Sequence, residues 1–284
     1  GGDSPESGNQ LNISGGKFIR SDSELRLIGG MTNNGSYVNY NILNVKGGFF
    51  EAGDEDRSIG LYGAYNSGTG ACHVTNNKIS FGADSGSISV AENSHIKIYG
   101  VYDSANGMGV EALNNTISII GDTDKTSFVT ITGACFSGSY MTVRAENNVV
   151  NIGKDDGSTV FKNMKFTSVL AESHNTECVM GTTFSGNTLN VNSKISVAGD
   201  VGGFQIINFT LPAGFGESDV MLTVGGTVKF DQTAIGINAL PGGFVAVKGS
   251  TVTLISANDF KGNYTSGLGT LELKDKKLCL TLSK

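Results

Sequence analysis

Three groups of charged residues in this 284-residue sequence have the composition that acid–base chemistry needs. Cleavage of a polysaccharide requires paired carboxylates or a carboxylate beside a basic residue. The groups are Glu51, Asp54, Glu55, Asp56 with Arg57; Asp122, Asp124 with Lys125; and Asp155 with Asp156. Each group falls between predicted strands, in segments where Asp and Gly are common because they favour turns. We therefore interpret these residues as solvated corners and predict that the chain is not an enzyme. A carbohydrate-active enzyme is the alternative.

The histidines and cysteines form no metal or redox motif. His73, His95 and His174 stand far apart and lack the HExxH spacing of a zinc site. The cysteines contain no CxxC pair, so we predict no metal and no cofactor. They are Cys72, Cys135, Cys178 and Cys279. We interpret them as small buried apolar residues, and a disulfide between neighbouring repeats, such as Cys72 with Cys135, is the alternative.

Aromatic residues recur in three successive segments, and they are the candidates for a binding surface. They are Tyr62, Tyr65, Tyr99, Tyr102 and Phe136. Residues at equivalent places of adjacent repeats form a column, which either fills the core or, where exposed, contacts a sugar or a protein. Alternation along a strand places Tyr99 on the opposite side from Ile98, so we expect part of the column to face outward.

A short unit that starts with Asn and continues as an alternating apolar run is repeated along the chain. Its clearest copy is Asn114-Asn115-Thr116-Ile117-Ser118-Ile119. The Asn marks fall at residues 9, 41, 77, 115, 148 and 187, in steps of 32, 36, 38, 33 and 39 residues. Asn tolerates the left-handed backbone of a corner, and stacked Asn side chains hydrogen-bond to one another. We predict that Asn115 turns the chain and that the repeats share a structural ladder of Asn41, Asn77, Asn115, Asn148 and Asn187.

A second mark, an apolar strand ending in Gly, lies between the Asn marks. It falls at Gly29, Gly63, Gly100 and Gly133, and we assign these residues to corners as well. No segment sustains helical spacing of its apolar residues, whereas runs of four to six residues alternate. The sequence therefore predicts an all-β fold, a parallel β-helix (β-solenoid) in which each strand pairs with the matching strand one repeat away.

The sequence divides into three parts. Residues 1–8 have linker composition and are predicted to be disordered, and residues 9–240 carry repeats of about 36 residues. Residues 241–284 begin after the repeats with Pro241-Gly242-Gly243 and are predicted to form a capping β module. Within it, two alternating runs flank Asp275-Lys276 like a hairpin, and a stack of repeats needs such a cover at its open end.

Charge and hydropathy exclude several classes of partner. The net charge of −6 argues against nucleic acid and against anionic lipid, both of which require a basic surface. No run of about 18 apolar residues is present, so we predict no membrane insertion by this part of the protein. The hydrophobic content of 38% is too high for a disordered chain. We expect a monomer.

The repeats resemble the passenger domains of bacterial type V autotransporters. The resemblance lies in strands that end in Gly-x-Tyr and are followed by Asn-Asn-x-Ile-x-Ile, as in Tyr99 to Ile119, and it covers nearly the whole chain. The stretch from Gly249 to Leu282 is similar to the module that ends pertactin-like passengers. The chain differs from the family in having four cysteines, because such passengers usually have few or none.

This resemblance implies a right-handed β-helix that is secreted through the outer membrane of a bacterium. It also implies adhesion, so we expect a non-enzymatic passenger domain at the bacterial cell surface or secreted. The expected partner is a protein or glycan on a host or neighbouring cell. A structural stalk without a ligand is the simpler expectation within the same class.

Overall fold

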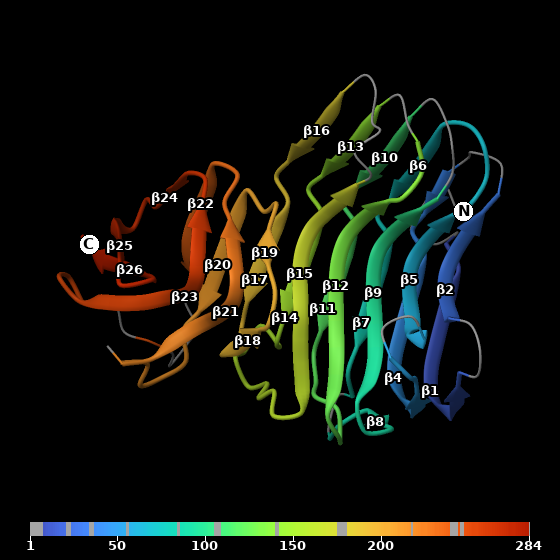
Figure 1. Ribbon diagram of the computed structural model, residues 1–284, viewed down its shortest axis with the longest axis horizontal. Helices are drawn as coiled ribbons and strands as arrows, with labels where there is room; N and C mark the ends of the chain where they lie inside the picture. Colours follow the sequence, from blue (N-terminus) through green and yellow to red (C-terminus); the bar gives the residue numbers. More distant parts are fainter. Residues whose placement is uncertain are drawn as a thin grey trace.

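The computed structural model of the chain is built of strands and turns, and its described residues include no helix (Figure 1). It describes residues 8–20, 24–33, 37–54, 57–83, 86–104, 109–139, 142–174, 181–216, 218–238, 244 and 247–283. Almost all of the predicted linker, and the break at Pro241-Gly242-Gly243, lie outside these residues. No helix long and apolar enough to span a bilayer occurs in this part of the chain.

Sheet A is a row of parallel strands. In spatial order they are β1 (Gln10–Ile19), β4 (Ile42–Glu51), β7 (Lys78–Phe81), β11 (Thr116–Ile119), β14 (Val149–Ile152), β17 (Thr188–Val191), β20 (Ile206–Thr210), β22 (Thr233–Asn238) and β24 (Tyr264–Thr265), with β8 (Ser89–Val90) beside β4. Ile42 lies opposite Lys78, Lys78 opposite Thr116, and Thr116 opposite Val149. Each of these strands therefore pairs with the matching strand one repeat away, as predicted.

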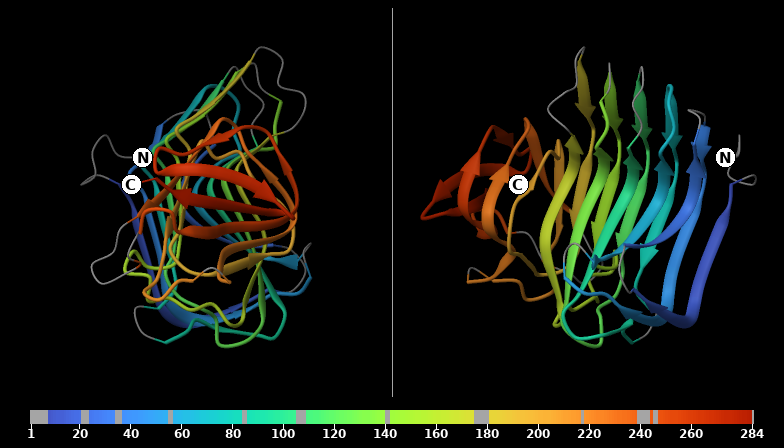
Figure 2. Two further views of the ribbon diagram at one scale, coloured as in Figure 1. Left: turned by 90° about the vertical axis from the view of Figure 1, so that its left-hand side faces the viewer. Right: turned by 45° about the vertical axis from the view of Figure 1, so that its right-hand side comes forward.

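Two further sheets are also parallel, except that β26 pairs antiparallel with β23 and β25 in sheet B (Figure 2). Sheet B contains β2 (Leu25–Thr32), β5 (Ile59–Asn66), β9 (Ser94–Asp103), β12 (Ser127–Phe136), β15 (Met164–His174), β18 (Ile195–Val197), β21 (Val220–Lys229), β23 (Thr251–Lys261), β26 (Lys277–Leu282) and β25 (Gly269–Lys274), with β19 (Val201–Gly202) paired to β15 and β21. Sheet C contains β16 (Thr182–Ser185), β13 (Val143–Glu146), β10 (Val110–Leu113), β6 (Cys72–Thr75) and β3 (Tyr37–Asn39). The chain is thus all-β, with parallel sheets of many strands.

Alternation along each strand separates an inner from an outer face. In β11, Ile117 and Ile119 are buried, whereas Thr116 and Ser118 are half-buried on the other side. The inner faces build two separate apolar clusters. The large core, rich in Ile, Leu and Phe, joins sheet A to sheet B, and in β5, β9 and β12 it uses the first half of the strand. The small core, made mostly of Val and Ala, joins the second half of β5, β9 and β12 to sheet C.

The repeated glycines mark the place where sheet B passes from one core to the other. In β9, Ile98 belongs to the large core and Val101 to the small core. These two inward-facing residues are three positions apart, so the alternation of inward and outward side chains is interrupted at Gly100. A Cβ on Gly100 would lie 2.5 Å from the carbonyl oxygen of Gly133, and one on Gly63 would lie 2.7 Å from that of Gly100. Close strand packing is therefore the reason for Gly at these positions.

The assignment of these glycines to corners is wrong. Gly29, Gly63, Gly100 and Gly133 all lie inside strands of sheet B, and none has a positive φ. Glycine is needed here for its missing side chain and not for its backbone freedom.

The repeats shorten after residue 187. Thr188 of β17 lies opposite Ile206 of β20, a step of only 18 residues, and Ile206 lies opposite Ala234 of β22, a step of 28. Sheet C ends at β16, while sheets A and B continue. The described part of the chain therefore has three sheets up to about residue 187 and two sheets beyond it, which differs from the uniform 36-residue repeat expected to residue 240.

An antiparallel hairpin closes the C-terminal end, as predicted. Strands β25 and β26 pair around Asp275 and Lys276, whose φ values of 49° and 60° form the tight turn. Strand β26 also pairs antiparallel with β23, so the hairpin extends sheet B. Leu278, Leu280 and Leu282 point into the large core and cover it.

Candidate functional site

The five predicted Asn residues form a buried chain of amides between the two cores. The side-chain Nδ2 and the backbone N–H of Asn77 both donate to Oδ1 of Asn115, at 3.0 Å each. Asn115 repeats this arrangement with Asn148, and Asn148 with Asn187. The Nδ2 group of Asn115 also donates to the carbonyl oxygen of Val74 in sheet C. The ladder therefore binds sheet C to sheet A in addition to joining successive repeats.

The residue that turns the chain precedes each ladder residue. Asn76, Asn114 and Asn147 have φ values of 58°, 58° and 55°, whereas Asn115 has no positive φ. The prediction that Asn115 turns the chain is therefore wrong. In the Asn-Asn pair the first residue takes the left-handed backbone, and the second supplies the buried amide.

Sequence inspection missed the last member of the ladder. The backbone N–H of Asn187 donates to Oε1 of Gln205, at 2.9 Å, and Nε2 of Gln205 donates to Asp231, at 2.7 Å. Gln205 carries the same amide group but lies only 18 residues after Asn187. A search for Asn at steps near 36 residues could not find it, whereas a search for either amide at any spacing would have done so.

Four of the five aromatic candidates form a compact group, here called the tyrosine tetrad. The rings of Tyr62 and Tyr99 stack at 5.2 Å, and those of Tyr65 and Tyr102 stack at 5.4 Å. Tyr62 and Tyr65 are buried, yet they belong to neither core cluster. They lie on the outer side of sheet B, where the guanidinium carbon of Arg26 stands 5.1 Å from the Tyr65 ring centre.

Hydroxyl groups of the tetrad are held by polar partners. Tyr62 donates to Glu24 at 2.7 Å, and Arg26 donates to the Tyr65 hydroxyl at 2.8 Å. Burial, and then the hydrogen bond to Glu24, raises the pKa of Tyr62 well above its usual value. The hydrogen bond to Glu24 likewise raises the pKa of Arg26. Tyr62 and Tyr65 are therefore packed against the other rings and their polar neighbours and leave little ring surface for a ligand, whereas Tyr99 and Tyr102 are half-buried on the outer side of the sheet.

Phe136 does not belong to this column. Cys135 lies opposite Tyr102, and Phe136 lies opposite the buried Asp103. The Phe136 side chain points into the small core. A shift of one residue moves a side chain to the other face of a strand, and this shift separates Phe136 from the tyrosines.

The acidic groups are tied into turns where the structure describes them. Asp54 pairs with Arg57 at 3.7 Å, and Asp122 accepts backbone N–H groups from residues 162, 163 and 164. Asp124 accepts the backbone N–H of Val90. Asp155 and Asp156 accept hydrogen bonds from Asn192 Nδ2 and the Ser158 backbone. Glu55 and Asp56 lie outside the described residues, and the three groups stand in separate loops.

No disulfide joins Cys72 to Cys135, so that alternative is wrong. Cys135 and Cys279 are free thiols, and Cys178 lies outside the described residues. No cluster of three or more His, Cys, Asp or Glu side chains suited to a metal ion occurs in the described ranges.

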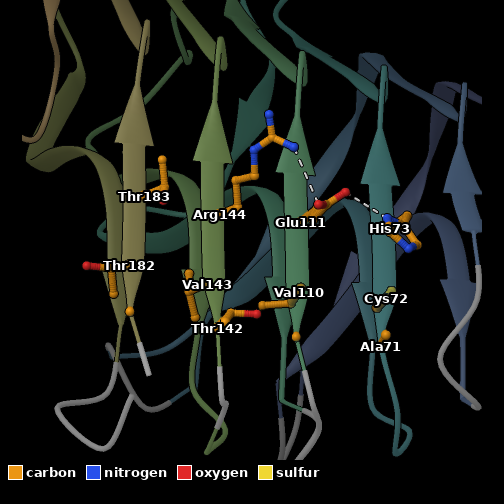
Figure 3. A pocket seen from close by; sticks show the side chains of 12 residues that line it. Ala71, Cys72, His73, Val110, Glu111, Thr142, Val143, Arg144, Thr182 and Thr183 are labelled. Atoms are coloured by element: carbon orange, nitrogen blue, oxygen red, sulfur yellow. Dashed lines mark hydrogen bonds and ion pairs between the residues drawn. The ribbon is translucent and has the colours of Figure 1, made fainter. Parts of the chain in front are cut away.

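The best candidate site is a groove on the outer face of sheet C. It has a volume of about 460 Å³ and runs across β6, β10, β13 and β16 (Figure 3). His73, Glu111 and Arg144 occupy the same register position on neighbouring strands, followed by Thr183 on β16. Tyr37, in register with His73 on β3, is 58% exposed and stacks on the imidazole with ring centres 4.9 Å apart.

Polar contacts link this row from strand to strand. His73 Nδ1 lies 2.7 Å from one carboxylate oxygen of Glu111, and Arg144 Nη1 donates to the other at 3.4 Å. Arg144 Nη2 donates to Glu146 at 2.7 Å. This hydrogen bond lowers the pKa of Glu146 and raises that of Arg144, so both groups stay ionised. The groove thus offers an aromatic ring, hydroxyls and an oriented ionic network.

Sequence inspection overlooked this row, apart from noting His73 as isolated. Tyr37, His73, Glu111 and Arg144 are 36, 38 and 33 residues apart, the same steps as the ladder. Their types differ from repeat to repeat, so a search for repeated residues passes over them. Aligning the repeats on the Asn marks and comparing the outward positions of each strand would have assembled the row. His95 and His174 lie elsewhere, in sheet B.

Comparison with known proteins yields no match: no family model, no curated protein and no solved structure is similar to this chain at a significant level.

Proposed function

We propose that the chain is a right-handed parallel β-helix of the autotransporter-passenger kind, and that it is a non-enzymatic adhesion module at the surface of a bacterium or secreted from it. The observation that carries the proposal is the outward-facing row of Tyr37, His73, Glu111, Arg144 and Thr183 along the groove of sheet C. The parallel register from repeat to repeat supports the fold. The resemblance of the repeats to autotransporter passengers supports the cellular setting.

A glycan on a host or neighbouring cell is the partner that suits this row best. Strands lie about 4.8 Å apart, so the row from β3 to β16 extends over roughly 19 Å, long enough for several sugar units. The Tyr37 ring is a flat apolar surface for a sugar face, and the Glu111–Arg144 pair presents both acceptors and donors to hydroxyls. Arg144 is neutralised by Glu111 and Glu146, which favours a neutral glycan over an acidic one.

The carboxylates in the turns favour binding over catalysis. Asp122 accepts three backbone N–H groups, and Asp54 is paired with Arg57, so each has a structural partner. Hydrolysis or elimination needs convergent groups placed on one side of a bound sugar. In the groove, the one carboxylate of the central row, Glu111, is shared between His73 and Arg144.

Binding of the purified protein to a glycan array and to cultured cells tests the proposal. We expect Tyr37→Ala and Arg144→Ala each to weaken binding about tenfold, since each removes one contact worth about 1.4 kcal/mol. Lys78→Ala, an exposed change on the outer face of sheet A, is the matched control and should leave binding unchanged.

Two results would overturn the proposal. One is glycan or cell binding that neither groove variant alters. The other is turnover of a polysaccharide by the wild-type protein that is lost in Asp54→Asn, which would restore the enzyme alternative. No binding to any glycan or cell would leave the stalk expectation in its place.

A further inference from the structure

One edge of sheet C is open in the middle of the molecule. Strand β16 pairs with β13 on one side and with no described strand on the other. Sheets A and B continue past this level with β17 and β18, so the body of the protein extends beyond the edge (Figure 1). The open edge of β16 therefore forms a step in the side of the stack.

Along this step, backbone groups of β16 have no backbone hydrogen-bond partner among the described residues. Val143 N–H donates to the Gly181 carbonyl oxygen at 3.1 Å, and Asn147 N–H donates to that of Ser185 at 2.9 Å. In a parallel ladder, alternate residues direct both backbone groups to opposite sides. Residues 181, 183 and 185 therefore face β13, and the N–H and C=O groups of Thr182 and Phe184 face the step.

The other sheet edges carry features that hinder strand addition. Strand β1 contains an irregular register after Ile13, and β25 carries the exposed charges of Glu272 and Lys274. Strand β2 carries the exposed Arg26. Strands β3 and β24 are only three and two residues long.

Strand β16 lacks such features. Its sequence, Thr182-Thr183-Phe184-Ser185, contains no charge and no proline, and its pairing with β13 shows no bulge. Thr182, Thr183 and Ser185 are exposed. Phe184 is half-buried and packs on the small core, so that core is incompletely covered at this end.

We propose that β16 is a strand-addition site that accepts an extended peptide segment of a partner protein. The peptide backbone pairs with Thr182 and Phe184, and an apolar side chain of the peptide packs beside Phe184 on the small core. A single strand needs about 4.8 Å along the stack. A second whole copy of the chain would bring its own two-sheet part against this one, so a peptide is the better occupant.

Panning a displayed library of seven-residue peptides against the wild-type protein supplies the probe. Thr182→Pro removes an N–H that faces the step while leaving every bond to β13 in place, and Thr182→Ala is the matched control that keeps the N–H. We expect enriched peptides to bind Thr182→Ala as they bind the wild type. Their affinity for Thr182→Pro should fall about tenfold or more.

Amide exchange by NMR gives a readout that needs no variant. A saturating enriched peptide should slow exchange at Thr182 and Phe184, while Thr183, already paired with β13, should change little. The proposal is overturned if no peptide discriminates Thr182→Pro from Thr182→Ala and the two amides gain no protection. It is also overturned if the wild-type protein forms a dimer that Thr182→Pro dissociates, because the occupant is then a second copy.

Discussion

The three-sheet part, up to about residue 187, and the two-sheet part after it bury their apolar side chains in different ways. The two-sheet part relies on the large core, with side chains such as Phe204, Phe209 and Leu280, and on a hairpin cap. The three-sheet part adds a small core of Val and Ala and a buried amide ladder. Sheets A and B continue past the last described strand of sheet C, so the large core extends through both parts.

The candidate binding elements also lie in a different part of the fold from most of the large core. The candidate groove and the open strand β16 both belong to sheet C, which is held by small apolar side chains and by hydrogen bonds. Sheets A and B carry most of the large buried residues. Elements that bind partners are commonly drawn from the less stable regions of a protein. The comparison therefore predicts that sheet C opens more readily than sheets A and B.

The largest effect is expected from Asn115→Ala, which breaks the ladder. It leaves the buried N–H groups of Asn77 without their acceptor and the Val74 carbonyl without its donor. We expect the free energy of unfolding to fall by about 3–5 kcal/mol, as for loss of a buried hydrogen-bond network. Denaturant unfolding measures this change.

Hydrogen exchange in the same variant sharpens the comparison. Amides of β10 and β13 in sheet C should exchange faster, while those of β11 and β12 keep most of their protection. The control is Asn151→Ala, which removes a half-buried amide on the outer face of sheet A and should cost less than about 1 kcal/mol. Equal acceleration in all three sheets would show that sheet C is not a separable unit.

A smaller effect is expected from Leu280→Ala in the cap. Leu280 is fully buried in the large core, so its truncation should lower the free energy of unfolding by about 2–4 kcal/mol. Exchange should accelerate first in β22, β23 and β26, and sheet C should be unaffected. Leu273→Ala, an exposed change in the same hairpin, is the control and should alter stability little. Faster exchange in sheet C would contradict the independence of the two parts.

The smallest effect concerns the reactivity of Cys135, on the outer side of sheet B. Burial, together with the charges of Glu172 and Asp103, raises the pKa of this thiol to about 12. The thiol of an unfolded chain titrates near pH 8.5, and only the thiolate is alkylated. The folded protein should therefore react slowly with iodoacetamide at pH 8.5, and its rate should rise about tenfold per pH unit toward pH 12.

Mass mapping of the peptide that contains Cys135 measures this rate. Because the folded pKa is raised, Cys135 contributes stability below about pH 8.5 that is lost as the pH rises toward 12. The variant Cys135→Ser should not show this part of the loss of stability between about pH 8.5 and pH 12. Rapid alkylation of the folded protein at pH 8.5 would contradict the assignment.

The periodic features of the fold were predictable from sequence, because they depend on residues that recur. Alternation in segments such as Thr116–Ile119 predicts parallel strands one repeat apart, and Asp275-Lys276 predicts the hairpin. The steps of the Asn marks predict which residues stack. These signals follow from the two-residue period of a strand and from turn chemistry.

Features that break the period were not predictable in the same way. Gln205 replaces Asn after only 18 residues, where the steps between the five predicted ladder residues are 33 to 39 residues. The phase shift at Gly100 depends on the approach of Gly133, which only packing reveals. Of the candidate site, the spacing of Tyr37, His73, Glu111 and Arg144 was present in the sequence, but their differing types concealed it.

The ladder has a direction. The side-chain Nδ2 of each ladder residue from Asn9 to Asn148 donates to Oδ1 of the next residue along the stack, so the amide dipoles of these side chains point the same way. Aligned amide dipoles add, as they do along an α-helix, and their N–H end is electropositive. That end is the Gln205 amide, which donates to the carboxylate of Asp231. The interior of the three-sheet part is thus polarised along the ladder, and the Asp231 carboxylate lies at the electropositive end.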